Sequence, residues 1–77
     1  MYDAKQLKTL RKLLGLTCEE VGKNVYLSRQ QISNIETGKT DQKSTLLLLN
    51  YWYDDYMKKN QIEVIDLINN IKDELLE

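Results

Sequence analysis

The chain has 77 residues with one cysteine, no histidine and a net charge of −1, which divides into +3 over residues 1–43 and −4 over residues 44–77. This length predicts a single domain, and the lone Cys18 excludes an internal disulfide and, without histidine, a zinc site of the usual kind. No apolar run approaches the ~20 residues of a membrane span and no signal peptide is recognisable, so we expect a cytoplasmic protein whose basic first half alone favours nucleic acid.

Three helix starts in the first half of the chain share one signature. Asp3, Thr17 and Ser28 are each followed three residues later by a glutamine or glutamate, which is the spacing of a capping box. An apolar residue directly precedes each cap and another follows it at the spacing of a hydrophobic staple. With Gly15 and Gly38 as helix ends, the pattern predicts helices over residues 5–14, 18–24 and 29–37.

The second and third predicted helices form one unit. The second is short, and only three residues separate it from the Ser28 cap, so the two helices cross steeply as a helix-turn-helix. The small Gly22 is expected to let them approach closely. The spacing directs four apolar side chains inward: Val21, Val25, Ile32 and Ile35. The outward face of the third helix then carries groups that suit either base edges or plain solvent, namely Arg29, Gln30, Ser33, Asn34 and Thr37.

The second half of the chain predicts two further helices, over residues 44–58 and 61–76, and no strand. The fourth helix is apolar over most of its circumference, and the face expected to close the core holds Leu46, Leu49, Tyr53 and Tyr56. We expect one domain over residues 1–77, with a four-helix core over 1–58 and a C-terminal segment over 59–77 that closes the core or dimerises. The residues expected at a dimer or partner interface are Tyr51, Trp52, Ile68, Ile71 and Leu75.

Residues 10–39 resemble the lambdoid repressor/Cro-type helix-turn-helix family, most specifically in Thr17-x-Glu-Glu-Val and in Ile32-Ser-x-Ile-Glu-x-Gly-Lys39. The resemblance covers roughly residues 5–53 and implies an all-α, compact five-helix, lambda-repressor-like DNA-binding domain with its helix-turn-helix at helices 2 and 3. It also implies a structural ion pair between Arg11 and Glu36. The implied base contacts are Ser28, Arg29, Gln30, Ser33 and Asn34. The implied phosphate contacts are Thr17, Cys18, Thr37, Lys39, Thr40 and Lys43.

Three positions depart from the family pattern. Cys18 stands where the family usually has a glutamine that helps to hold a phosphate and to brace the recognition helix. Gly22 occupies a position that is usually small or alanine. Tyr26 stands at a turn position that often carries glycine, so we expect a tyrosine with a positive φ angle. A thiol at a helix N-terminus can have a lowered pKa and sense redox state, but Cys18 lacks a basic neighbour in sequence and we expect it to be a packing residue.

These features predict a transcriptional repressor of bacterial or phage origin that binds double-stranded DNA at a palindromic operator as a homodimer, without cofactor or metal. The alternative is a protein-binding antirepressor, or a regulatory partner from a phage or mobile element, that uses the apolar C-terminal helices. An enzyme is not expected, because the chain lacks histidine, a nucleophile with a plausible base, and a glycine-rich phosphate loop. Asp54 and Asp55 are adjacent, so on a helix they do not face one another as a catalytic pair would.

Overall fold

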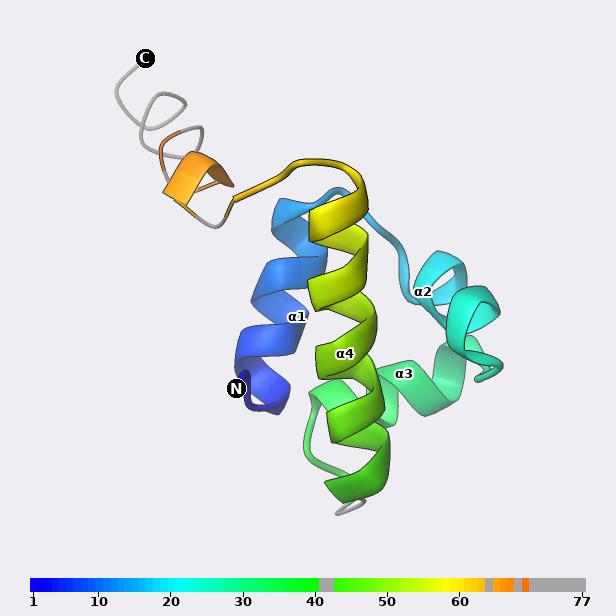
Figure 1. The fold of residues 1–77 in the computed structure, drawn as a ribbon. Coiled ribbons are helices and arrows are strands. Elements are labelled where there is room, and N and C mark those ends of the chain that lie inside the picture. Colours follow the sequence, from blue (N-terminus) through cyan, green and yellow to red (C-terminus); the bar gives the residue numbers. More distant parts are fainter. Residues whose placement is uncertain (41–42, 64, 68, 70–77) are drawn as a thin grey trace.

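In a computed structural model, residues 1–40, 43–63, 65–67 and 69 are described, and these residues contain helices and no strand. The helices within residues 1–40 and 43–63 are α1 (Ala4–Leu13), α2 (Cys18–Val25), α3 (Arg29–Glu36) and α4 (Lys43–Lys59). Figure 1 shows α1 and α4 running side by side, with α2 on the far side of α4 and α3 crossing near the start of α4. The predicted all-α fold with a helix-turn-helix at its second and third helices is confirmed.

The helix starts follow the capping signatures in the sequence. The side chains of Asp3, Thr17 and Ser28 accept hydrogen bonds from backbone N–H groups three residues on, at 2.8, 3.1 and 3.1 Å. In each case the glutamine or glutamate at that third position accepts in return from the backbone N–H of the cap, which completes a capping box. The predicted bounds of these helices and of α4 lie within one or two residues of the observed ones.

The predicted fifth helix does not begin where expected. Gln61 has a left-handed backbone with φ 54°, and it ends the turn that follows α4. Residues 65–67 are helical, and most of the remaining stretch of the 61–76 prediction lies outside the described residues. A left-handed residue breaks the run of α-helical dihedrals that a continuous helix requires, so the start predicted at residue 61 is wrong.

Left-handed residues also end the helices of the first half. Gly15 and Gly38 have φ angles of 71° and 74°, and neither carries a Cβ to clash in that conformation. Tyr26, the C-cap of α2, has φ 60° and ψ 38°. For a residue other than glycine this conformation costs roughly 1–2 kcal/mol. The positive φ angle expected at Tyr26 is therefore present.

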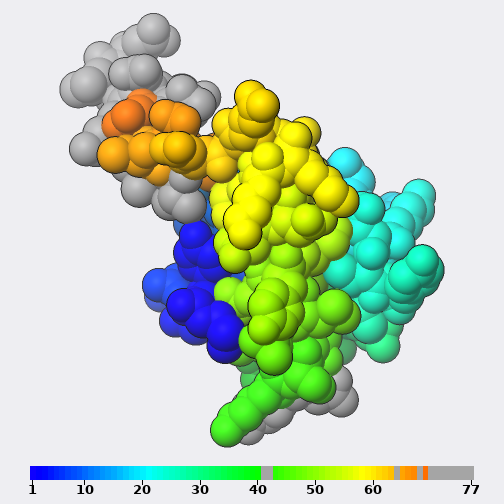
Figure 2. Space-filling model, viewed as in Figure 1, coloured from blue at the N-terminus to red at the C-terminus, as the bar shows by residue number. Residues whose placement is uncertain are grey.

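The core lies where α1, α2 and α3 meet the inner face of α4. Val21, Val25, Ile32 and Ile35 are buried as predicted, against Leu7 and Leu10 of α1. The inner face of α4 differs from the prediction, because Leu46 and Tyr56 are only half-buried. The residues of α4 that are buried are Leu49, Asn50, Tyr53 and Met57. Figure 2 shows the outer side of α4 between α1 and α2.

Gly22 is required by the turn rather than by α3 itself. A Cβ at this position would overlap the carbonyl oxygen of Leu27, in the turn between α2 and α3. The Leu27 N–H also donates to the Gly22 carbonyl at 2.9 Å. The close approach that was expected is therefore between α2 and the backbone that leads into α3, which sets the angle between the two helices.

Asn50 fastens the N-terminus of the chain to α4. Its amide nitrogen donates to the carbonyls of Tyr2 and Leu46, both at 2.9 Å, and its oxygen accepts from the Tyr2 N–H at 2.7 Å. A buried amide is stable when its donors and acceptor are satisfied in this way. Sequence reasoning missed Asn50; the available signal was a single polar residue in the apolar run of 46–53.

Candidate functional site

The outer face of α3 presents polar side chains to solvent. We define this face as Ser28, Arg29, Gln30, Ser33 and Asn34. Arg29 and Gln30 stand exposed in the first turn of the helix, while Ser33 and Asn34 are half-buried one turn further on. The Gln30 amide nitrogen donates to the Asn34 oxygen at 2.9 Å. Arg29 forms no ion pair with any side chain among the described residues, so its guanidinium is available to a ligand.

Ser28 has two functions at the start of this face. Its hydroxyl oxygen accepts from the Gln31 N–H at 3.1 Å, and its own N–H donates to the Gln31 side chain at 2.8 Å. The hydroxyl proton takes no part in these bonds and remains a free donor. The capping box therefore holds the first turn of α3 in place and leaves the Ser28 hydroxyl able to donate.

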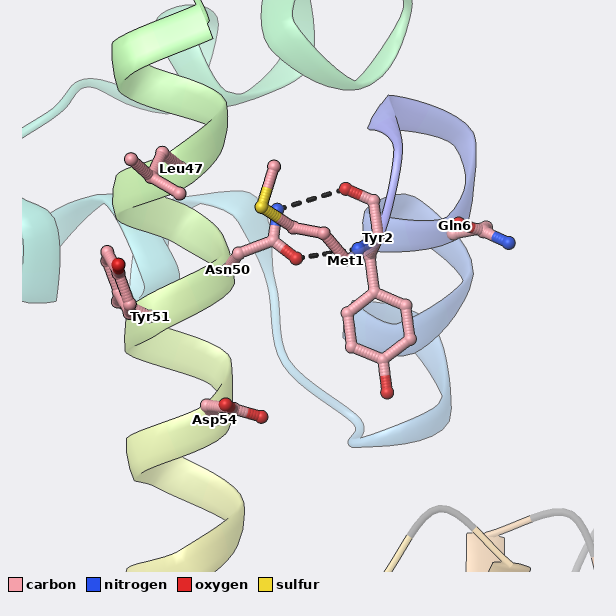
Figure 3. Close-up of a pocket in the computed structure, with 7 residues that line it drawn as sticks. All are labelled: Met1, Tyr2, Gln6, Leu47, Asn50, Tyr51 and Asp54. Atoms are coloured by element: carbon pink, nitrogen blue, oxygen red, sulfur yellow. Dashed lines mark hydrogen bonds between the residues drawn. The ribbon is translucent and has the colours of Figure 1, made fainter.

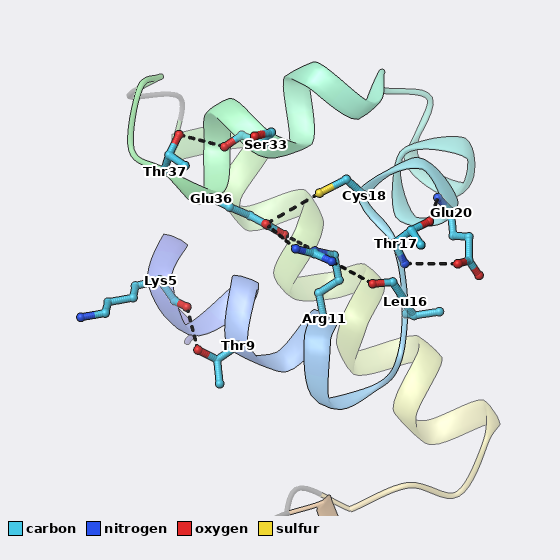
Figure 4. A network of polar contacts seen from close by, with 10 residues as sticks. All are labelled: Lys5, Thr9, Arg11, Leu16, Thr17, Cys18, Glu20, Ser33, Glu36 and Thr37. Atoms are coloured by element: carbon cyan, nitrogen blue, oxygen red, sulfur yellow. Dashed lines mark hydrogen bonds and ion pairs between the residues drawn. The ribbon is translucent and has the colours of Figure 1, made fainter.

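A buried ion pair joins α1 to the end of α3 (Figure 4). The Arg11 Nε donates to Glu36 Oε2 at 2.8 Å and its Nη2 donates to Glu36 Oε1 at 3.1 Å, while Nη1 donates to the Leu16 carbonyl at 2.8 Å. Only 12% of the Arg11 side chain and 3% of the Glu36 side chain are exposed. The hydrogen bond that Arg11 donates to Glu36 raises the pKa of Arg11 above its ordinary value, so this arginine is charged and holds the fold.

The Cys18 side chain turns toward the same carboxylate. Its Sγ donates to Glu36 Oε1 at 3.9 Å, as Figure 4 shows. Burial, helped by the negative charge of Glu36, raises the pKa of the Cys18 thiol. A redox-sensing thiol needs the opposite shift, so the expectation of a packing residue fits the geometry. The sulfur faces inward, and only the backbone of Cys18 is available at the start of α2.

The Tyr53 hydroxyl is directed into the core near this ion pair. It is buried and has no hydrogen-bond partner among the described residues. Burial is the main cause that raises the pKa of Tyr53, and the charge of Glu36 adds to it. A buried hydroxyl without a partner is an uncommon and costly feature. Tyr53 was expected in the core, but its orphaned hydroxyl has no signal in the sequence.

The residues expected to contact phosphates occupy two places around α3. Thr17 and Cys18 begin α2, where Thr17 is exposed and its side chain is used as the cap. The other members are exposed, and they follow α3 or begin α4: Thr37, Lys39, Thr40 and Lys43. The Thr37 hydroxyl donates to the Ser33 carbonyl at 2.9 Å. The two groups thus lie at the beginning of α2 and after the end of α3.

The residues expected at an interface differ in their surroundings. Tyr51 is 67% exposed. Trp52 is half-buried against the core, with its ring 5.0 Å from that of Tyr53 and 5.2 Å from that of Tyr56, so it is largely occupied within the chain. Ile68, Ile71 and Leu75 lie outside the described residues.

A groove lies beside Tyr51, between the N-terminus and α4 (Figure 3). It has a volume of about 560 Å³, and its lining residues are Met1, Tyr2, Gln6, Leu47, Asn50, Tyr51 and Asp54. Leu47, which lines the groove, and the next residue, Leu48, are partly exposed, by 38% and 45%. The i, i+4 spacing of Leu47 and Tyr51 is the sequence signal for this patch.

The described residues contain no group of three or more histidine, cysteine, aspartate or glutamate side chains that could hold a metal ion. Among the helices in the described part of the chain, none is long and apolar enough to cross a membrane. The sequence matches the family described as helix-turn-helix domain over residues 4–49, which includes α1, α2, α3 and the start of α4. Neither the curated proteins nor the solved structures gave a match to the chain.

Proposed function

This chain belongs to the helix-turn-helix domain family, and we propose that it is a sequence-specific transcriptional repressor of the lambdoid repressor/Cro type. It binds double-stranded DNA at a palindromic operator as a homodimer. The observation that carries the proposal is the outer face of α3, where the exposed side chains of Arg29 and Gln30 stand in the first turn of the second helix of the motif. In a helix-turn-helix this end of the recognition helix enters the major groove.

The side chains on this face suit base edges. Arg29 can donate two hydrogen bonds to O6 and N7 of a guanine. Gln30 can accept from N6 and donate to N7 of an adenine, because its bond to Asn34 at 2.9 Å uses only one of the two amide hydrogens. That bond also restricts the Gln30 rotamer, which reduces the entropy lost on binding. Each well-placed contact discriminates against a wrong base by ~1–3 kcal/mol.

Contacts to phosphates supply affinity and orientation. Lys39 and Lys43 carry the positive charge, with the Thr37 and Thr40 hydroxyls beside them in sequence, and all four are exposed. At the other end, the first turn of α2 after Thr17 and Cys18 offers backbone N–H groups and a partial positive charge to an anion. These contacts fix the protein on the duplex and carry no sequence information.

The second subunit of the proposed dimer docks on the exposed patch of α4, defined as Leu47, Leu48 and Tyr51. An apolar patch of this kind on a small monomer commonly marks an interface. A two-fold axis through it would bring Leu47 of one copy close to Tyr51 of the other, which is the self-complementary arrangement of a symmetric dimer. Such a dimer reads two half-sites about 34 Å apart, one turn of DNA.

Selection of binding sequences from a randomised duplex pool at moderate salt tests the DNA-binding proposal. The wild-type protein is expected to enrich a palindromic motif, and Arg29→Ala is expected to lose the preference at one base pair of each half-site. Lys12→Ala, which removes an exposed charge from α1, is the matched control and should enrich the wild-type motif. No enrichment from folded wild-type protein would reject the repressor and favour the antirepressor, a protein-binding partner that uses the α4 patch.

The oligomeric state is tested separately by sedimentation. Tyr51→Glu places a charge in the patch and is expected to raise the dimer dissociation constant at least about tenfold. Thr9→Glu places the same charge at an exposed position of α1 outside the patch and the groove beside it, and should leave association unchanged. Equal association of wild type and Tyr51→Glu would rule out this surface as the dimer contact.

A further inference from the structure

Tyr26 combines two unfavourable features in one residue. Its backbone is left-handed, with φ 60° and ψ 38°, a conformation that favours glycine. Its side chain is 96% exposed, so no packing within the described part of the chain compensates for the strain. A strained residue with an unused side chain at the turn of a binding motif suggests that the side chain acts on a ligand.

Tyr26 lies close to the end of α3 that is proposed to enter the major groove. The turn between α2 and α3 lies at the outer edge of the molecule, next to the start of α3 (Figure 1). Ser28 lies two positions after Tyr26, and two residues of chain span at most about 7 Å. The major groove is only about 12 Å wide. With the first turn of α3 inside the groove, the long Tyr26 side chain is within reach of its phosphate edge.

The charges nearest to Tyr26 along the chain favour an anionic ligand. Lys23, which pairs with Glu19 at 3.7 Å, precedes it by three residues in the last turn of α2. Arg29, which has no ion-pair partner among the described residues, follows it by three residues. Both side chains are exposed. A tyrosine hydroxyl is one of the groups that donate to phosphate oxygens in protein–DNA complexes.

We propose that the Tyr26 hydroxyl donates a hydrogen bond to a DNA phosphate at the edge of the groove that α3 enters. The inference rests on the proposed DNA binding. It makes Tyr26 a positioning and affinity residue, without base discrimination, and it explains why a tyrosine occupies a left-handed position in this chain.

Tyr26→Gly removes both the backbone strain and the proposed phosphate contact. It is therefore expected to raise stability and to lower affinity. Relief of the left-handed strain should raise the midpoint of thermal unfolding by about 2–5 °C. Affinity should fall about tenfold, by the same factor for the selected operator and for a duplex of unrelated sequence. The salt dependence of binding should keep its slope, because no charge has been removed. Fluorescence anisotropy on both duplexes measures the affinities and the salt slope, and thermal unfolding followed by circular dichroism measures the midpoint.

Tyr26→Phe keeps the ring and the backbone strain and removes only the hydroxyl, so it should lose affinity as Tyr26→Gly does without the gain in stability. Wild-type affinity in Tyr26→Phe or in Tyr26→Gly would overturn the inference and leave the repressor proposal intact. A loss confined to the operator would also overturn it, because a phosphate contact is the same on any sequence. Absence of binding by the wild type to either duplex would overturn both proposals.

Discussion

The two arginines of this chain have the same side chain and opposite surroundings. Arg11 lies between α1 and α3, where the Glu36 carboxylate and the Leu16 carbonyl take its donors. Arg29 stands exposed in the first turn of α3 without an ion-pair partner in the described part of the chain. The helix α3 is thus fastened by its C-terminal residue on the inner side and presents its N-terminal residues on the outer side. Burial, rather than residue type, therefore separates the charge that holds the helix from the charge that is proposed to contact DNA.

The largest effect is expected from breaking the inner contact. Arg11→Met should lower the free energy of unfolding by about 3 kcal/mol, because it leaves the buried Glu36 carboxylate without its partner. Urea denaturation followed by circular dichroism measures this loss. Lys23→Met, which breaks the exposed pair with Glu19 at 3.7 Å, is the control and should cost less than about 1 kcal/mol.

A double variant sharpens this prediction. Replacing both partners by apolar residues, as Arg11→Met with Glu36→Leu, should recover at least half of the loss, because no unpaired charge then stays buried. If Arg11→Met alone unfolded at the same urea concentration as the wild type, Arg11 would not be the structural arginine.

The outer arginine should show the reverse pattern. Arg29→Ala is expected to leave the free energy of unfolding within about 0.5 kcal/mol of wild type, as for most surface changes. Its affinity for the selected operator should fall by ~1–3 kcal/mol for each half-site. Denaturation and anisotropy on the same preparation measure both. A large stability loss without selective loss of affinity would place Arg29 with Arg11 and remove the contrast between them.

A smaller and less selective effect is expected after the end of α3. Lys39→Gln should weaken binding to all duplexes alike and reduce the slope of log affinity against log salt by about 1 for each subunit. Titrations at several salt concentrations measure the slope. An unchanged slope would exclude Lys39 from the phosphate contacts.

The smallest effect concerns Cys18, which faces the inner ion pair. Burial and the charge of Glu36 raise the pKa of the Cys18 thiol above the ordinary 9.0. Above this ordinary value the unfolded chain therefore releases a proton that the folded chain still keeps. Stability should therefore fall as the pH rises above about 9. Cys18→Ala should show a shallower fall in urea midpoint over this range. Equal slopes in the two proteins would show that the thiol does not contribute.

Local signals in the sequence were sufficient for the helix-turn-helix. The capping boxes at Asp3, Thr17 and Ser28 depend on side chains three residues from the cap, and the left-handed turn at Tyr26 depends on the family pattern around it. The inward residues of α2 and α3 followed from helical spacing alone. Such features are decided by neighbours along the chain, and they therefore appear in the sequence pattern.

The face of α4 that closes the core could not be predicted from the sequence. This helix is apolar nearly all round, so the spacing of its apolar residues does not favour one face. The tertiary structure decided that Asn50 and Met57 point inward and that Leu46 and Tyr56 are half-buried. It likewise decided that Trp52 packs on its neighbours while Tyr51 stays exposed.

The helices of the first half, their crossing and the identity of the side chains on α3 could all be predicted from the sequence. Which of those side chains are exposed could not, because exposure depends on contacts between residues distant along the chain. Cys18 turns inward because the Glu36 carboxylate lies there, held by Arg11 of another helix. Tyr26 projects outward because none of the described elements packs against it.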